Sequence, residues 1–104
     1  MGNSAEIRRI DREIRKVTNK LEAVRRGEWW PLTSRERLAM TRAMASGARS
    51  IQQGRSTGRA EDRMDTIGSG AETRLNAELN ALYFERRRLV TEQARDKAAK
   101  KSWF

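Results

Sequence analysis

The stretch IRRIDREIRKVTNKLEAV, residues 7–24, decides the fold of this chain. Its apolar residues recur at alternating spacings of three and four, and they are Ile7, Ile10, Ile14, Val17, Leu21 and Val24. On a helix this spacing places all six side chains along one face, which is the seam of a heptad repeat. We therefore predict a helix over about residues 4–26 whose seam packs against another helix.

A second helix is predicted over about residues 34–53. Thr33 and Glu36 have the T-x-x-E spacing of a capping box, which marks a helix start. We expect one apolar stripe on this helix, formed by Met40, Met44, Ala48 and Ile51. The small residues Ala43 and Gly47 predict that another helix approaches closely on this element.

Residues 54–70 contain four glycines and are predicted to form a Gly-rich hinge. The hinge has room for a short helix, on which Met64 and Ile67 would face inward. Ser69 and Glu72 then have the spacing of another capping box.

A long last helix is predicted from this second box, over about residues 70–101. Its apolar stripe consists of Leu75, Leu79, Leu82 and Leu89. Arg86, the first of three consecutive arginines, falls on this stripe, so we expect it to meet a carboxylate on another helix or chain. Arg87 and Arg88 are expected to remain free.

The fold class expected from these patterns is all-α, in one helical domain spanning residues 1–104. The helices would form an antiparallel hairpin or a three-helix arrangement, with coiled-coil-like first and last helices. Leu, Ile, Val and Phe together number only 17 of the 104 residues, which is below the ~20% typical of ordinary cores. We therefore expect the chain to be an oligomer or to gain stability from a partner.

The residue types present argue against several function classes. The chain has no Cys and no His, so it lacks thiolate metal ligands and the commonest general base. No spacing pairs a nucleophile with a base, so we expect no enzyme activity and no cofactor or metal. The chain also lacks an apolar run near the ~20 residues of a membrane span, and its start lacks the layout of a signal peptide. The expected location is the cytoplasm of a host or virus-infected cell, or a virion.

The charge of the chain predicts a polyanionic partner. The net charge is +9, from 23 basic and 14 acidic residues. The net charge is negative in one segment, residues 61–80, which has five acidic and two basic side chains. The predicted nucleic-acid contacts are Arg8, Arg12, Arg15, Arg87, Arg88, Lys100 and Lys101. The alternative is that the basic side chains form solvated faces paired with interleaved acids, or that the many arginines reflect codon bias.

Aromatic residues provide the other candidate contacts, and they are Trp29, Trp30, Trp103 and Phe104. Next to basic residues they could stack on the bases of single strands or fill pockets of a protein partner. The alternative is that the tryptophans cap the ends of the helix bundle.

Two functions follow as hypotheses. The first is nonspecific nucleic-acid binding through Arg-rich helix faces, within a nucleoprotein assembly. The second is a protein–protein adaptor, structural component or inhibitor, such as a small phage structural or host-takeover protein. In that role the aromatic anchors and apolar seams would dock on an acidic protein surface. Added salt separates the two, because it weakens phosphate-driven binding far more than apolar docking.

Overall fold

The computed structural model describes residues 2–102 of the chain and the side chains of residues 3–100. This part of the chain contains three helices, α1 (Gly2–Arg25), α2 (Ser34–Gln52) and α3 (Gly58–Ser102), and no strand. The all-α class is thereby confirmed.

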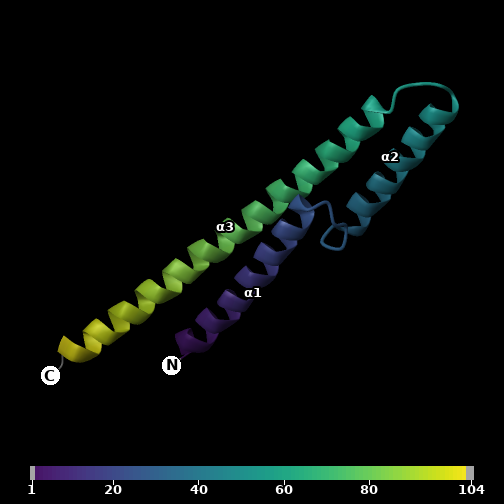
Figure 1. Ribbon diagram of the computed structural model, residues 1–104. Coiled ribbons are helices and arrows are strands. Elements are labelled where there is room, and N and C mark those ends of the chain that lie inside the picture. The colour runs from purple at the N-terminus through teal and green to yellow at the C-terminus, as the bar shows by residue number, and fades with distance from the viewer. Residues whose placement is uncertain (1, 103–104) are drawn as a thin grey trace.

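The three helices form a rod that is two helices thick. The 45 residues of α3 span about 67 Å at 1.5 Å per residue. Both α1 and α2 lie antiparallel to α3, one after the other along its length (Figure 1). Their backbones each approach α3 and not one another. The described chain measures 81 × 19 × 16 Å, so of the two predicted alternatives the structure has the three-helix arrangement, extended along one axis.

The seam of α1 packs on the carboxyl-terminal half of α3. Ile10, Val17, Leu21 and Val24 are buried, and Ile7 and Ile14 are half-buried. Two polar contacts define the antiparallel register. The amide of Gln93 donates to the Ser4 hydroxyl over 2.9 Å, and the guanidinium of Arg86 lies 2.7 Å from the Asp11 carboxylate.

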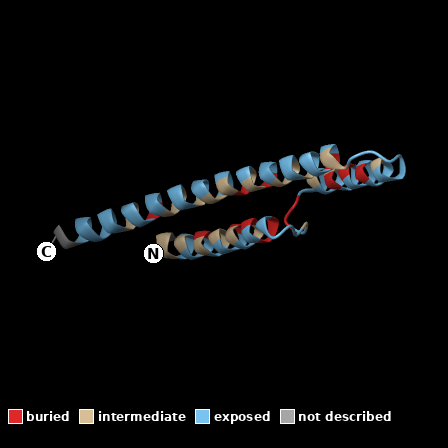
Figure 2. Ribbon diagram, turned by 45° about the horizontal axis from the view of Figure 1, so that its top comes forward, coloured by how far each residue is buried: buried red, intermediate tan, exposed pale blue. Residues whose placement is uncertain are grey.

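The main core lies where α3 packs against the end of α1 and the start of α2. Figure 2 shows buried segments on all three helices near this junction. Its buried members are Val17, Leu21, Val24, Leu32, Met40, Ala71 and Leu75. Leu75 is completely buried. This cluster joins both short helices to the long one.

The start and the contact face of α2 agree with the sequence predictions. The Thr33 N–H donates to a Glu36 carboxylate oxygen over 2.8 Å, and the Glu36 N–H donates to the Thr33 hydroxyl over 3.2 Å. Ala43 and Gly47 are buried against α3. A Cβ atom at Gly47 would lie 3.1 Å from the Cβ of Ala60, so glycine allows the close approach of the two helices.

The single apolar stripe predicted for α2 is wrong. Met40 is buried, but Met44 and Ile51 are 53% and 65% exposed, and Ala48 is also exposed. In a rod two helices thick, α2 has one contact face, and Ala43 occupies it together with Met40. Met44 follows Ala43 by a turn of about 100°, which carries it off that face.

The predicted hinge at residues 54–70 is also wrong for most of its length. The helix α3 begins at Gly58 and continues through Gly68 and Gly70. Glycine in a helix interior costs about 1 kcal/mol, and we attribute the continuity to packing of the neighbouring Met64 and Ile67, which are half-buried against the core. Both therefore face inward, as predicted.

The capping box predicted at Ser69 is consequently absent, because Ser69 lies inside α3, where its carbonyl accepts from the Thr73 hydroxyl. Polar contacts at the start of α3 come from residues further upstream. The Thr57 hydroxyl donates to Glu61, and the Ser56 hydroxyl accepts from the Gly58 N–H.

Candidate nucleic-acid interface

The outer face of α1 gathers six cationic side chains, which we call the α1 basic face: Arg8, Arg9, Arg12, Arg15, Lys16 and Lys20. The arginines and Lys16 are exposed, and Lys20 is half-buried. At about 100° per residue, the six positions cover an arc of about 140° opposite the buried seam. No carboxylate falls on this arc between residues 5 and 20.

The acidic residues of α1 occupy the flanks between the seam and the α1 basic face. Asp11 reaches across to Arg86 of α3, and Glu13 pairs with Lys16 over 3.3 Å. Among the described residues, the other five cations of the face make no hydrogen bond or ion pair. The acids interleave with the bases in sequence, but the helix separates them in space and leaves the arc positive.

The three consecutive arginines of α3 have three different environments. Arg86 binds Asp11 of α1, which confirms the predicted acceptor carboxylate. The expectation that Arg88 remains free is wrong, because it pairs with Glu85 one turn before it and with Glu92 one turn after it. Positions three and four apart share a helix face, so these charges meet within α3.

The ion pairs of Arg88 shift the pKa values of two groups. The hydrogen bond from Arg88 lowers the pKa of Glu85, and the same carboxylate raises the pKa of Arg88. Arg87 is exposed and, within the described chain, has no partner. It lies about 160° around α3 from the buried Leu89, so it does not join the α1 basic face.

The predicted contacts near the end of α3 are only partly described. Lys100 is exposed, and with Lys97 it lines a hollow of about 590 Å³ that also includes Asn3 and Ser4 of α1. The side chain of Lys101 lies outside the described residues.

The aromatic candidates differ in how far they are buried. Trp29 is half-buried against the core, whereas Trp30 is 51% exposed. The carbonyls of both tryptophans accept from the Arg37 guanidinium over 3.3 and 2.8 Å. Trp103 and Phe104 lie outside the described residues. Trp30 is therefore the one described aromatic from this set that presents most of a large side chain to solvent.

The sequence prediction missed the exposure of three large apolar side chains on α2, Leu38, Met44 and Ile51, which are 52–65% exposed. Met44 and Ile51 are seven residues apart and share one side of the helix, whereas Leu38 lies at least about 120° away from both. This exposure has a signal in the sequence, because the apolar and small residues of 38–51 are too many for one helix face. No charged side chain lies between Leu38 and Ile51 except Arg42 and Arg49. By helical spacing both lie on the side of Leu38 and away from Met44 and Ile51.

A polar junction near Pro31 was not predicted either. Arg74 lies 3.0 Å from the Glu36 carboxylate and 3.3 Å from that of Glu78, and it donates to the Pro31 carbonyl over 3.5 Å. Burial acts to raise the pKa of Glu36, but hydrogen bonds from Thr33 and Arg74 outweigh it, so the pKa is lowered. This carboxylate therefore links the cap of α2 to α3.

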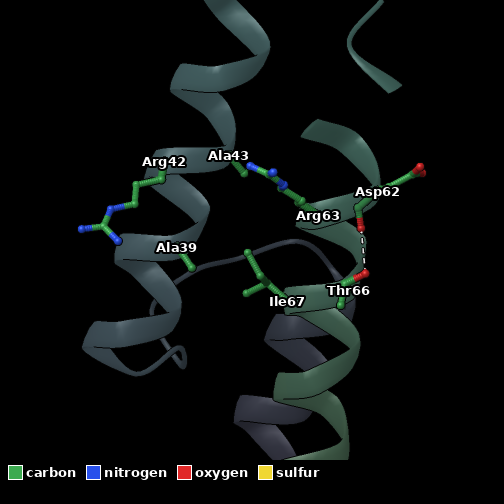
Figure 3. A pocket seen from close by; sticks show the side chains of 7 residues that line it. All are labelled: Ala39, Arg42, Ala43, Asp62, Arg63, Thr66 and Ile67. Atoms are coloured by element: carbon green, nitrogen blue, oxygen red, sulfur yellow. Dashed lines mark hydrogen bonds between the residues drawn. The ribbon is translucent and has the colours of Figure 1, made fainter. Parts of the chain in front are cut away.

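A groove of about 430 Å³ lies between α2 and α3, and its polar side chains do not point toward a common centre (Figure 3). Its lining is Ala39, Arg42, Ala43, Asp62, Arg63, Thr66 and Ile67. The Arg42 and Asp62 side chains point away from it, and the Thr66 hydroxyl is bonded to the Asp62 carbonyl. Nowhere in the described chain do three or more acidic side chains gather as a metal site would need.

Two further findings bear on function. Within residues 2–102, no helix has the length and apolar character needed to span a membrane. Comparison with protein-family models, curated proteins and solved structures finds no match to this chain.

Proposed function

We propose that the protein binds nucleic acid without sequence specificity, as a non-enzymatic component of a nucleoprotein assembly, and that the α1 basic face makes the contact. The observation that carries this proposal is the arc of six cations with no carboxylate among them. The alternative of a neutralised, solvated face accounts less well for this arc, because Lys16 is its one member in an ion pair and Arg9 is the one other member whose charge acts on a carboxylate, that of Glu85.

The geometry of α1 suits a phosphate backbone. The arc from Arg8 to Lys20 is about 18 Å long at 1.5 Å per residue. Duplex DNA presents one negative charge per ~1.7 Å of axis, so about ten phosphates lie within that length. Arginine forks match phosphate oxygens, and the buried seam holds the helix that carries them. Such contacts fix position and carry no base sequence information.

The test measures affinity for duplex DNA and single-stranded RNA of arbitrary sequence across a range of salt. Replacing Arg8, Arg12 and Arg15 by Gln should weaken binding equally on all sequences. Each lost phosphate contact should flatten the log–log salt slope by about 0.9 on duplex DNA, or roughly 2.7 in total.

A matched control replaces Arg42, Arg49 and Arg59 by Gln, which are exposed and, within the described chain, unpaired. The control removes the same net charge from outside the α1 basic face, so it should keep most of the salt slope. Equal losses in both triple variants would contradict the assignment to α1. Absence of binding at low salt would contradict nucleic-acid binding altogether.

A second candidate function is docking on an acidic protein surface, as an adaptor, structural component or inhibitor. The exposure of Met44 and Ile51, which share one side of α2, favours it, because exposed apolar patches mark interaction sites. Binding to a partner that persists at high salt and is lost in Met44→Asp would support this function over the first. In this role the chain would be a small phage structural or host-takeover protein, located in an infected cell or in a virion.

A further inference from the structure

One side of α3 lies mostly outside its contacts with α1 and α2, and its residues are spaced three or four apart along the helix. Its edge borders two hollows shared with the rest of the chain, at Glu72 beside Val24 and Trp29 and at Lys97 beside Asn3 and Ser4. We call this side the α3 stripe: Asp62, Asp65, Ser69, Glu72, Asn76, Asn80, Tyr83, Arg87, Val90, Ala94 and Lys97. Glu72 and Asn76 are half-buried, and the other members are exposed. Residues at this spacing share one side of a helix over about 52 Å.

Charge divides the α3 stripe into two halves. Its first half carries the carboxylates of Asp62, Asp65 and Glu72, and its second half carries the cations Arg87 and Lys97. Within the described chain, none of these five side chains has an ion pair. What sets the α3 stripe apart is this separation of charge, with the carboxylates in its first half and the cations in its second half.

We propose that two copies of this chain pair antiparallel along the α3 stripe. A twofold axis between residues 79 and 80 places Glu72 opposite the partner subunit's Arg87. The same axis places Asp62 opposite the partner subunit's Lys97. Every pairing occurs twice, because a twofold interface uses the same surface on both copies.

The remaining positions of the α3 stripe are compatible with this register. Asn76 faces the partner subunit's Tyr83, which allows a hydrogen bond between an amide and a phenol. Ser69 faces the partner subunit's Val90, and Asp65 faces the partner subunit's Ala94, so no two bulky side chains collide. A parallel pair in register would instead place carboxylate on carboxylate and cation on cation, which is unfavourable.

The pairing is independent of the proposed function, because it uses the exposed side of α3 and leaves the α1 basic face free. It places the two α1 helices at opposite ends of the paired rod, since each lies along the carboxyl-terminal half of its own α3. Attraction between exposed charges is screened by salt, so the dimer should weaken as ionic strength rises.

The experiment measures the mass of the full chain by sedimentation velocity over a range of concentrations at low and moderate salt. Glu72→Arg and Arg87→Glu should each weaken self-association by about tenfold or more, because each replaces two attractions by two repulsions per dimer. The double variant with both changes restores opposite charges and should dimerise again. An equimolar mixture of the two single variants should form heterodimers.

Two matched controls carry the same charge changes outside the α3 stripe. Arg95→Glu lies about 110° around α3 from the middle of the stripe, Glu22→Arg lies on α1, and both positions are exposed. Neither change should weaken dimerisation. Circular dichroism establishes that each variant keeps its helix content. The exposed pair Asp62→Lys and Lys97→Glu provides a second test, should the half-buried Glu72 not tolerate arginine.

Three outcomes would overturn the proposal. One is a wild-type chain that stays monomeric at low salt, and another is self-association that neither pair of charge reversals weakens. The last is weakening by both single variants without recovery in the mixture or the double variant. Self-association that survives the charge reversals and is lost in Met44→Asp would place the interface on the exposed face of α2 instead.

Discussion

The perturbation with the clearest structural basis is Leu75→Ala, which removes the largest completely buried side chain of the described chain. Leu75 lies in the cluster that contains Leu21 and Val24 of α1 and Met40 of α2. One truncation therefore loosens both short helices from α3. Leu→Ala changes at buried sites cost roughly 2–5 kcal/mol, depending on how far the surroundings can collapse.

The shape of the molecule narrows this range. A rod only two helices thick has solvent close to every core side chain, so its neighbours can relax more easily than those in a deep core. We expect a loss of about 3 kcal/mol, in the lower half of that range. A chain of this size has a total stability of roughly 5–15 kcal/mol. The melting temperature should fall by roughly 12–24 °C.

The assay is urea unfolding followed by circular dichroism, at one protein concentration, because any self-association would make stability depend on concentration. The control is Leu38→Ala on α2, where the same atoms are removed from a side chain that is 52% exposed. The control should change stability by no more than ~0.5 kcal/mol. A difference between the two variants below about 1 kcal/mol would refute the assignment of Leu75 to the shared core.

Three further predictions follow from the helix contacts. Gly47→Leu should destabilise the chain by roughly 1–3 kcal/mol, because a Cβ there already lies 3.1 Å from that of Ala60; an unchanged urea midpoint would contradict the close packing. Arg86→Gln should cost less than ~1 kcal/mol, since both partners of its pair with Asp11 are over 40% exposed; a double-mutant cycle giving a larger coupling would disprove this. The lowered pKa of Glu36 means that its ionised form stabilises the fold above the ordinary carboxyl pKa, and that this contribution disappears as the pH falls through the lowered value; melting curves of Glu36→Gln should accordingly show a weaker loss of stability on acidification than those of the unaltered chain.

The sequence alone determined the elements whose signals are local. The repeat from Ile7 to Val24 gave the first helix and its buried face, because spacings of three and four define one side of a helix. Thr33 and Glu36 located the start of the second helix, because a capping box satisfies backbone donors within a few residues. The need of Arg86 for a carboxylate was also predictable, because the spacing of the leucines around it shows that it lies on an apolar stripe.

The candidate nucleic-acid face was only partly predictable. The basic residues of α1 are visible in the sequence, and three of them, Arg8, Arg12 and Arg15, were predicted as contacts. Whether the neighbouring acids neutralise them depends on which side of α1 meets α3, and that is a tertiary contact. Arg88 shows the opposite outcome, because its partners Glu85 and Glu92 neutralise a side chain that the sequence suggested was free.

Only the tertiary structure decided the path of α3 and the exposure of α2. Local propensity predicts a break at Gly68 and Gly70, yet α3 is continuous there, because burial of neighbouring side chains outweighs the small cost of glycine in a helix. Met44 and Ile51 are apolar, yet they face solvent, because α1 and α2 lie end to end along α3 and no third helix covers them. Residue spacing records which side chains share a face, but the number of helices that cover that face is set by the packing of the whole chain.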